Sequence, residues 1–458
     1  MFGLNSIFRK KLVTNQGEIA QSSYVGLSDV GENIVSNTKG DRVIWSIVVI
    51  LTLASLLLVY SSTGLLAFRS SKTAESYLFK QFAFIISGLV IIYFAHRINY
   101  TIYSKVALIL FIISVPLLLF TLFFGVELNS GSRWIKLPII NMTLQTSDLA
   151  KLALFMYLSR MLSKKQHVIK DFKKGFLPII IPVILICLLI APANLSTSLL
   201  IGGTSMLLMF IGRVRTRHIL LTVGVAMIPL AILLSIAIST YDKKTQQTKG
   251  LPSFMSEGRI PTWISRIQTF IYSSKNDDND KSYQINQAKI AIANGGIFGS
   301  GPGNSKQRNY LPHCYSDFIY VIIIEEYGLI GAGFILFLYL MFLFRCIRIF
   351  RKSPYAFGAF LALALGFTLV IQAFMNMGVN VGLFPNTGVT LPLISMGGSS
   401  ILFTCFSIGI ILSVARNVEK AEGATVNISN KEPDHSSQPS DKAEGDKKEI
   451  DGASIGKS

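Results

Sequence analysis

The sequence has little charge for its length. Only 15% of its 458 residues are charged, whereas 51% are hydrophobic. A soluble domain of this size carries charge on about a quarter of its residues, so a water-soluble globular protein is excluded. Long apolar runs replace the missing charge, and about 20 such residues cross a bilayer as a helix. The sequence therefore predicts an all-α integral membrane protein.

Cysteine is also scarce. Three of the four cysteines lie in or at the ends of apolar runs, and only Cys314 lies in a polar loop. Their spacing predicts neither a disulfide framework nor a zinc site, so we expect packing residues. A cleavable signal peptide is not evident, because the residues before Val43 are polar and basic and the apolar run that follows is too long for an h-region.

Acidic residues are fewer than basic ones. The 43 basic residues outnumber the 25 acidic ones, which gives a net charge of +18. The excess lies mostly in short loops after every second apolar run, which is the pattern of the positive-inside rule. Membrane topology therefore explains the charge, and we expect no nucleic acid as a partner. The same pattern predicts that both termini face the cytoplasm.

About ten transmembrane helices are predicted. They cover residues 43–68, 82–95, 106–124, 144–162, 176–192, 196–211, 219–240, 318–344, 357–380 and 391–414. The domain organisation that follows is a cytoplasmic extension at 1–38, a membrane domain at 39–416 and a disordered cytoplasmic tail at 417–458. One long loop, 241–317, lies between the seventh and eighth spans and is predicted outside, and loops of this length are usually functional or disordered. Its glycine run at 295–303 allows close approach of a ligand or another backbone.

Three carboxylates lie in or beside the apolar eighth span: Asp317, Glu325 and Glu326. Ionisable residues at membrane depth are functional candidates. Asp317 stands where the helix is predicted to begin, so it is a candidate N-cap and a candidate proton acceptor in a partly dry pocket, two roles that are compatible. Glu325 and Glu326 are predicted to lie deeper along the helix, in a structural polar network.

Several cations lie in segments predicted outside. Arg133 and Lys136 flank Trp134, which is typical of an interfacial anchor or of a site for an anionic headgroup. Asp148 and Lys151, at the start of the fourth span, are spaced for an intrahelical pair. Four cations of the long loop are expected to aid surface solubility or to bind phosphate: Arg259, Arg266, Lys306 and Arg308.

Polar amides mark the ninth span. Gln372, Asn376 and Asn380 recur every four residues and so share one helix face, which must face protein or a water-filled cavity. The segment 382–400 that follows contains two prolines and a Gly-Gly pair, which predicts a broken or re-entrant element.

These segments, in this order, resemble the SEDS family of shape, elongation, division and sporulation proteins. The family's closing signature, Pro-x-Thr-Gly-x-x-Leu-Pro-x-x-Ser-x-Gly-Gly-Ser-Ser, matches residues 385–400. The resemblance covers about residues 39–416. Further matches are Tyr-Gln-x-x-Gln at 283–287, the glycine run at 295–303, Leu-Pro at 311–312, and Asp-Phe-Ile with Glu-Glu-x-Gly at 317–328.

The resemblance implies a peptidoglycan glycosyltransferase that polymerises lipid II with inversion at the anomeric carbon of MurNAc. Asp317 aligns with the family's essential aspartate and is the predicted base. The candidates for pyrophosphate binding are Arg133, Lys136 and Lys306. Further candidates for substrate binding are Gln284, Gln287, Ser395, Gly397 and Ser399, and the predicted polar network comprises Glu325, Glu326, Gln372 and Asn376. No metal ligand is predicted, although a divalent cation, Mg²⁺ or Mn²⁺, could accompany the pyrophosphate.

The resemblance also implies partners and a location. It implies the bacterial inner membrane, lipid II as substrate and a class B penicillin-binding protein as transpeptidase partner. The extensions at both ends favour the divisome (FtsW) type over the elongasome (RodA) type, which adds other divisome membrane proteins and the division septum. The sequence departs from the family at 312–318, which lacks the usual Glu and His, and at Asn194, which replaces a usual Asp.

Two other functions fit the same residues. Polar groups and broken helices inside a membrane also suit a transporter of lipid II. A non-catalytic scaffold that recruits the transpeptidase is the third alternative. The position of Asp317 separates the first two, because a base at the outer edge suits polymerisation and a transporter needs polar groups along its whole path.

Overall fold

The computed structural model describes most of the predicted membrane domain and the start of the tail. The predicted extension at 1–38 lies outside the described residues. The described ranges are 40–71, 73–127, 132–136, 143–242, 247–248, 259–272 and 280–429. The chain divides into two units, Met1–Glu419 and Lys420–Ser458, and the bundle belongs to the first.

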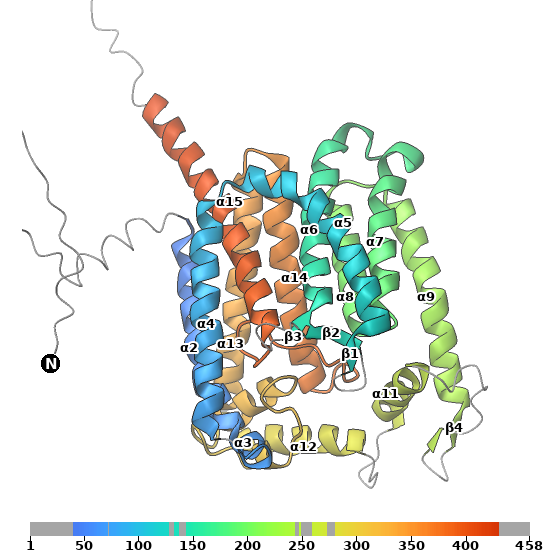
Figure 1. Cartoon of the computed structure of the whole chain (residues 1–458), viewed down its shortest axis with the longest axis vertical. Coiled ribbons are helices and arrows are strands. Elements are labelled where there is room, and N and C mark those ends of the chain that lie inside the picture. The colour runs from blue at the N-terminus through green and yellow to red at the C-terminus, as the bar shows by residue number, and fades with distance from the viewer. Residues whose placement is uncertain are drawn as a thin grey trace, which may run out of the picture. The chain divides into compact units, whose positions relative to one another are not determined.

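Among the described residues, ten helices match the ten predicted spans one by one (Figure 1). They are α2 (Arg42–Ser62), α4 (Ala74–Arg97), α5 (Tyr100–Phe124), α6 (Thr146–Lys164), α7 (Leu177–Ile190), α8 (Leu195–Ile211), α9 (Thr216–Ser239), α13 (Ile319–Lys352), α14 (Ala356–Asn380) and α15 (Ser399–Ser429). In the part of the chain that the structure describes, eight spans are long and apolar enough to cross a membrane, when α7 is counted together with the short helix before it as Phe172–Ile190. Of the other two, α8 is shorter, and α6 carries Asp148, Lys151 and Arg160 within the helix.

Shorter elements lie at the ends of the bundle. An antiparallel sheet contains β1 (Val126–Glu127), β2 (Ser132–Lys136) and β3 (Thr143–Gln145) in that order. The long loop contains β4 (Tyr241–Asp242), β5 (Gln247–Thr248), α11 (Ile260–Tyr272), α12 (Asp280–Gly295) and the 3₁₀ turn η3 (Gln307–Asn309). The remaining short helices are α3 (Gly64–Arg69), η1 (Gln166–Val168) and η2 (Phe172–Phe176). We call the end that carries α3, α11 and α12 the outer end, following the charge pattern.

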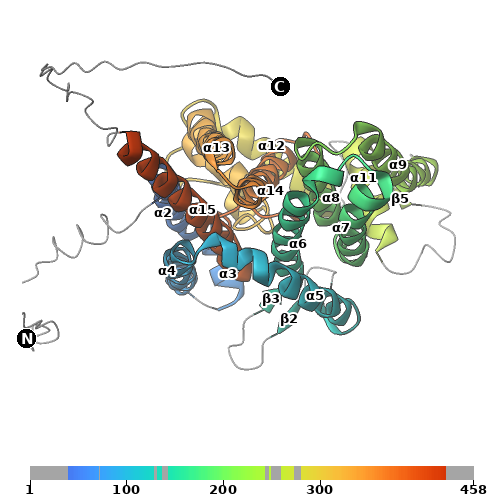
Figure 2. The same ribbon diagram turned by 90° about the horizontal axis from the view of Figure 1, so that it is seen from above.

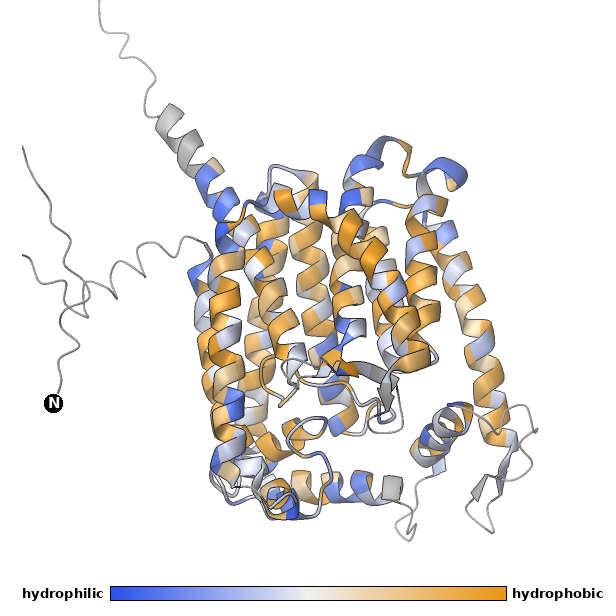
Figure 3. Ribbon diagram, viewed as in Figure 1, coloured by the Kyte–Doolittle hydropathy of each residue, from blue (hydrophilic) through white to orange (hydrophobic). Residues whose placement is uncertain are grey.

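Helix α14 is the centre of the bundle. In its most apolar stretch 83% of the residues are buried, compared with 6% in α9. It packs against α13, α6 and α8 (Figure 2). Hydrophobic residues run along the helices and hydrophilic ones gather toward their ends (Figure 3), as a lipid-solvated bundle requires. Because α14 is enclosed, its polar amides face protein, as predicted.

Helix α13 breaks at Gly328, where φ is +67°. The break interrupts the helical hydrogen bonds, and the glycine run replaces them. Ser300 and Gly301 donate their N–H groups to the carbonyls of Glu325 and Glu326, at 2.9 and 3.0 Å. On the other side, the N–H groups of the two residues after Gly328 donate to the carbonyls of Gly296 and Ile297. The close approach predicted for the glycine run is therefore between its own backbone and the backbone of α13.

Two predicted boundaries are wrong. The tenth span was expected from residue 391, but α15 begins at Ser399, because Pro392 and the Gly397-Gly398 pair disfavour a helix. Residues 381–398 form neither helix nor strand and contain many buried residues, so the broken element was predicted correctly. The tail was expected to lose its structure at 417, whereas α15 continues to Ser429.

Candidate active site

Asp317 lies in a turn that precedes α13, and its side chain is half-buried. The N-cap position of α13 is Phe318, so the prediction that Asp317 is the N-cap residue is wrong. The turn begins at His313, whose carbonyl accepts the N–H groups of Ser316 and Asp317 at 3.0 and 3.1 Å. His313 itself has a positive φ of 58°, and the turn is therefore tightly wound.

Three successive carbonyls fix this turn to the rest of the bundle. The Tyr315 carbonyl accepts the N–H of Met396 at 3.0 Å, and the Ser316 carbonyl accepts the Ser395 hydroxyl at 2.6 Å. The Asp317 carbonyl accepts two side-chain amides of α14, from Asn376 at 2.8 Å and Asn380 at 2.9 Å. Buried amides with these bonds hold the peptide of Asp317 in one position.

The carboxylate of Asp317 faces the loop that follows α14. A Cβ atom at Gly388 would lie 3.6 Å from Asp317 Oδ2, in ordinary van der Waals contact. The side chain of Asn386 organises this loop, because its Oδ1 accepts the N–H of Gly388 at 3.2 Å and its Nδ2 donates to Gln284 Oε1 at 3.3 Å. Gln284 therefore joins α12 to the loop beside Asp317, and Gln287 is half-buried on the same helix.

Two arginines of the long loop share the electrostatic environment of Asp317. Burial lowers the pKa of Arg266, the positive charge of Arg259 lowers it further, and the negative charge of Asp317 raises it. Arg259 and Asp317 therefore each lie within electrostatic range of Arg266. Sequence reasoning named both arginines without linking them to Asp317, because some fifty residues separate Arg266 from Asp317 and no local pattern connects them.

Glu325 and Glu326 are two of the four residues of the predicted polar network, and their hydrogen bonds within the described part of the chain do not include the other two, Gln372 and Asn376. Both glutamates are 1% exposed. The Glu325 carboxylate accepts the Ser305 hydroxyl and the N–H groups of Lys306 and Gln307, at 3.2 and 3.3 Å. The Glu326 carboxylate accepts the hydroxyl of Ser61.

The predicted depth of these glutamates is wrong. Ser61 is the penultimate residue of α2, so Glu326 lies at the outer end of that helix. The Asp317 carbonyl is in turn bonded to Asn380, the last residue of α14, so Asp317 and Glu326 lie at the same end of the bundle. The network anchors the long loop to α2 and α13.

Asp148 and Lys151 form the predicted ion pair, with 3.2 Å between Nζ and Oδ1. Lys151 also donates to Gln372 Oε1 at 2.9 Å, and Gln372 donates to the carbonyl of Thr390 at 3.0 Å. The pair therefore reaches the loop after α14. It lines a narrow pocket between α6, α14 and α15 together with Leu152, Phe155, Leu365, Thr368, Leu369, Ser400, Phe403, Thr404 and Ser407.

The three predicted pyrophosphate ligands are not brought together by any contact found among the described residues. Lys136 is exposed at the end of β2. Lys306 is also exposed, and its backbone N–H donates to Glu325. Arg133 lies in β2, and its side chain is outside the described part of the structure. Their role in substrate binding stays a prediction.

The serines of the closing signature bind other parts of the protein. Ser395 is 2% exposed, and its hydroxyl accepts the N–H of Leu391 at 2.8 Å while donating to Ser316. The hydroxyl of Ser399 accepts the N–H of Gln145 at 3.2 Å. The carbonyl of Gly397 accepts the N–H of Ser400. These contacts have a structural role, and the predicted contact with substrate stays untested.

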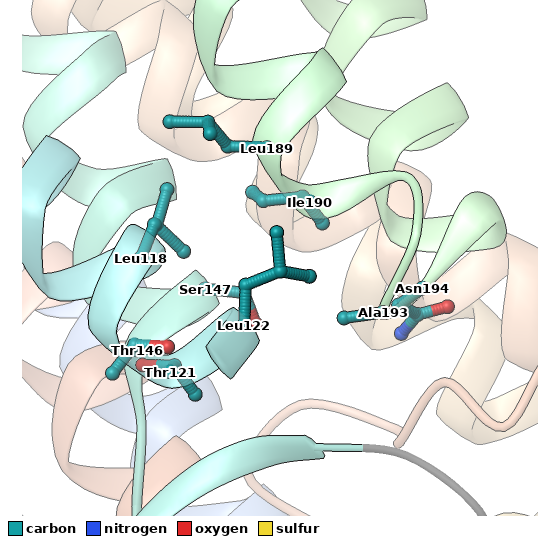
Figure 4. A pocket seen from close by; sticks show the side chains of 9 residues that line it. All are labelled: Leu118, Thr121, Leu122, Thr146, Ser147, Leu189, Ile190, Ala193 and Asn194. Carbon is teal, nitrogen blue, oxygen red and sulfur yellow. The ribbon is translucent and has the colours of Figure 1, made fainter. Parts of the chain in front are cut away.

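A separate pocket opens at the outer end between α5, α6, α7 and α8 (Figure 4). Among the residues that the structure describes, neither lysine nor arginine lines it, so its chemistry suits an apolar group better than a phosphate. Asn194, where the family has Asp, caps α8: its Oδ1 accepts the N–H of Thr197 at 3.4 Å. The lining residues are Leu118, Thr121, Leu122, Thr146, Ser147, Leu189, Ile190, Ala193 and Asn194.

The cysteines are packing residues, as predicted. Cys314, Cys346 and Cys405 are buried and Cys187 is half-buried, all as free thiols. Burial raises the pKa of the Cys314 thiol to about 12, so this thiol stays protonated at neutral pH and is a poor nucleophile.

Asn376→Ala is expected to destabilise the bundle by about 1–3 kcal/mol, because it removes the amide that bonds to the carbonyls of Asp317 and Val389. Heat unfolding in detergent measures the loss. The control is Asn304→Ala, which removes one exposed amide bonded to the Ser300 carbonyl and should change the midpoint little. Equal midpoints for the two variants would contradict the anchoring role of Asn376.

A family model of the cell cycle proteins FtsW, RodA and SpoVE matches residues 41–420 of this sequence. The chain belongs to the FtsW/RodA/SpoVE family. The membership confirms the resemblance to the SEDS proteins, and the matched range agrees with the predicted membrane domain to within a few residues.

Members of the FtsW/RodA/SpoVE family with curated names are similar over nearly their whole length. A probable peptidoglycan glycosyltransferase FtsW of Geobacter metallireducens is 33% identical over 391 residues, which are 84% of this chain and 97% of that protein. The protein of the same name from Hydrogenovibrio crunogenus is 33% identical over 385 residues, 82% of this chain and 92% of that protein. These relatives support the FtsW type.

Solved structures from the FtsW/RodA/SpoVE family have the same fold. A chain of a peptidoglycan synthase complex, studied for the coordination of polymerisation and crosslinking, superimposes with a TM-score of 0.61. It is 23% identical and the match covers 83% of this chain and 98% of that one. The rod shape-determining protein RodA of Thermus thermophilus gives a TM-score of 0.56 at 21% identity, covering 82% and 97%. At these identities the likeness concerns the fold alone.

Proposed function

We propose that this protein is a peptidoglycan glycosyltransferase that polymerises lipid II into glycan strands. The family and the names of its FtsW relatives support this activity. The observation that carries the proposal is the fixed turn at Asp317. Four hydrogen bonds hold the carbonyls of residues 315–317, while the carboxylate remains at the surface of the loop near Gly388.

The reaction needs one base and one group that stabilises the leaving diphosphate. Asp317 accepts the proton of the 4-hydroxyl of a GlcNAc as that oxygen attacks the anomeric carbon of a MurNAc. The bond between this carbon and the diphosphate oxygen breaks, and its electron pair leaves with the undecaprenyl pyrophosphate. One displacement inverts the carbon. A base must lie within hydrogen-bond reach of its proton, and the bonds to the turn restrict Asp317 to one position for this purpose.

The protein also needs partners and a location. We propose that it acts in the bacterial inner membrane at the septum, with both termini in the cytoplasm. The peptidoglycan synthase complex that shares its fold and the FtsW relatives support a class B penicillin-binding protein as the transpeptidase partner, together with other divisome membrane proteins. The two cytoplasmic extensions are consistent with contacts of this kind.

Reconstitution with lipid II tests the proposal. The purified full-length chain in detergent, with its cognate class B penicillin-binding protein inactivated at the transpeptidase site, should convert lipid II into glycan strands that a gel resolves. Assays with and without Mg²⁺ or Mn²⁺ test whether a divalent cation bound to the pyrophosphate increases the rate of polymerisation. Lipid II that crosses proteoliposomes without forming strands would instead indicate the transporter. Neither product, from a folded chain bound to its partner, would indicate the scaffold.

A further inference from the structure

We propose that Arg259 and Arg266 form a diphosphate-binding site on the outer-loop helix α11, beside Asp317. This inference rests on the proposed function, because the diphosphate is the leaving group of that reaction. Three features of the molecule support the site: the way α11 is seated, the charges that this seating brings together, and the chemistry of the guanidinium group.

Helix α11 is seated on the outer end of α9 by one face. Ile264 is fully buried, and Gln268, one turn later, is 5% exposed. The amide of Gln268 donates to the carbonyl of Ala237 at 2.9 Å and to the hydroxyl of Thr240 at 3.3 Å. An apolar contact and two hydrogen bonds therefore fix the rotation of α11 about its own axis.

This rotation directs the opposite face of α11 away from α9. Arg266 is two residues from both seated side chains, which is about 200° around a helix. Arg259 precedes Arg266 by seven residues, and its carbonyl already accepts the N–H of Trp263 at 3.1 Å, so it follows the same helical path. Seven residues are about two turns, and the two arginines therefore share one face with Trp263 between them.

The shared face carries an excess of positive charge near the base. Burial lowers the pKa of Arg266, as does the charge of Arg259, and the Asp317 carboxylate opposes both effects. Of these three neighbouring charges two are positive. Two like charges in a half-buried setting repel each other, so a further anion at this place would be stabilised.

A diphosphate fits this arrangement better than a carboxylate or a single phosphate does. Each guanidinium presents a planar fork that bonds two phosphate oxygens at once, and two forks on one helix face match two linked phosphoryl groups. As the bond to the anomeric carbon breaks, negative charge grows on the diphosphate oxygen, and cations already in place stabilise it most. Arg69 is exposed in the last turn of α3, has no role in the proposed site and provides a matched control.

Binding without turnover tests the site. The full-length chain in nanodiscs of neutral lipid is titrated with undecaprenyl pyrophosphate, and the fluorescence of Trp263 and the heat of binding are followed. Arg259→Gln and Arg266→Gln should each weaken binding by about tenfold or more, since a hydrogen bond to a charged group is worth about 1.5–3 kcal/mol. Arg69→Gln should leave the affinity unchanged. Equal affinities for wild type and both arginine variants would overturn the proposal.

Three further ligands distinguish a diphosphate site from general binding of anions. Undecaprenyl phosphate, inorganic pyrophosphate and phosphatidylglycerol should each bind more weakly than the lipid diphosphate, and equal binding of phosphatidylglycerol would reassign the arginines to general headgroup contact and contradict the proposal. Arg266→Lys keeps the charge but loses the fork, so it should fold and show an intermediate loss. If Arg266→Gln does not fold, the affinity of Arg266→Lys is compared with that of wild type instead.

A double-mutant cycle separates the effect of Asp317 on diphosphate binding from the effect of Arg266. Asp317→Asn should bind the diphosphate at least as tightly as wild type, because a nearby negative charge is gone. Arg266→Gln should weaken binding in this background too. If the effect of Arg266→Gln vanished there, Arg266 would serve only to pair with Asp317. Because no step measures polymerisation, the site can fail while the proposed function holds, and the reverse is also possible.

Discussion

Asp317→Asn is expected to reduce the rate of glycan polymerisation by about 10²–10⁴-fold, the usual contribution of a general base. The amide has nearly the same shape as the carboxylate but cannot accept the proton of the attacking hydroxyl. The bonds that hold the turn use the carbonyls of residues 315–317, so the substitution leaves them intact. The variant should therefore fold, bind its partner and lose only the chemical step.

The measurement is the initial rate of strand formation from lipid II at saturating partner, with heat unfolding as the check on folding. Glu75→Gln is the matched control, because it neutralises an exposed carboxylate in the first turn of α4 and should leave the rate unchanged. A normal rate for Asp317→Asn would remove Asp317 from the mechanism. A lower unfolding midpoint would show that the carboxylate stabilises the fold instead.

Gly299→Ala is expected to destabilise the membrane domain by more than about 3 kcal/mol. Gly299 has a positive φ of 84°, and an added Cβ would lie 2.2 Å from the carbonyl oxygen of Glu326. Relief of that overlap must separate the glycine run from the break in α13, which exposes the carbonyls that Ser300 and Gly301 now satisfy. Loss of buried backbone bonds adds to the cost of strain in the left-handed region.

Gly296→Ala provides the control for strain alone. Gly296 also has a positive φ, of 53°, but an added Cβ there would meet no atom within 4 Å. This variant should lose only about 1 kcal/mol. Fluorescence-detected gel filtration after heating compares the two. Equal midpoints would mean that the packing of the glycine run against α13 contributes little to stability.

The bundle could be predicted from the sequence because lipid leaves few choices. An apolar run of sufficient length must be a helix, and each of the ten predicted runs is one. The amides of α14 were assigned to the protein interior by their four-residue spacing, and Asn376 indeed bonds to the Asp317 carbonyl. Boundaries were less accurate where glycine and proline decide the path, as before Ser399.

The candidate site was only partly predictable. Asp317 was found through a family motif, and its fixed turn depends on Ser395 and Asn376, which the same reasoning had named. No pattern in the sequence predicts the electrostatic interaction between Asp317 and Arg266, because the two residues come within range of each other only in the folded chain. The break at Gly328 was also missed, since an apolar run reads as one helix and the carbonyls of Glu325 and Glu326 find their partners far along the chain.

The bonds to the turn at Asp317 also bear on the order of synthesis. The amides and hydroxyl that hold it come from residues 59, 63 and 79 positions later in the chain. A ribosome therefore inserts the turn and α13 into the membrane before any of these groups exists. A chain that stalls at that stage contains Asp317 but lacks the side chains that hold its turn in position. We therefore expect polymerase activity only once the loop after α14 is in place.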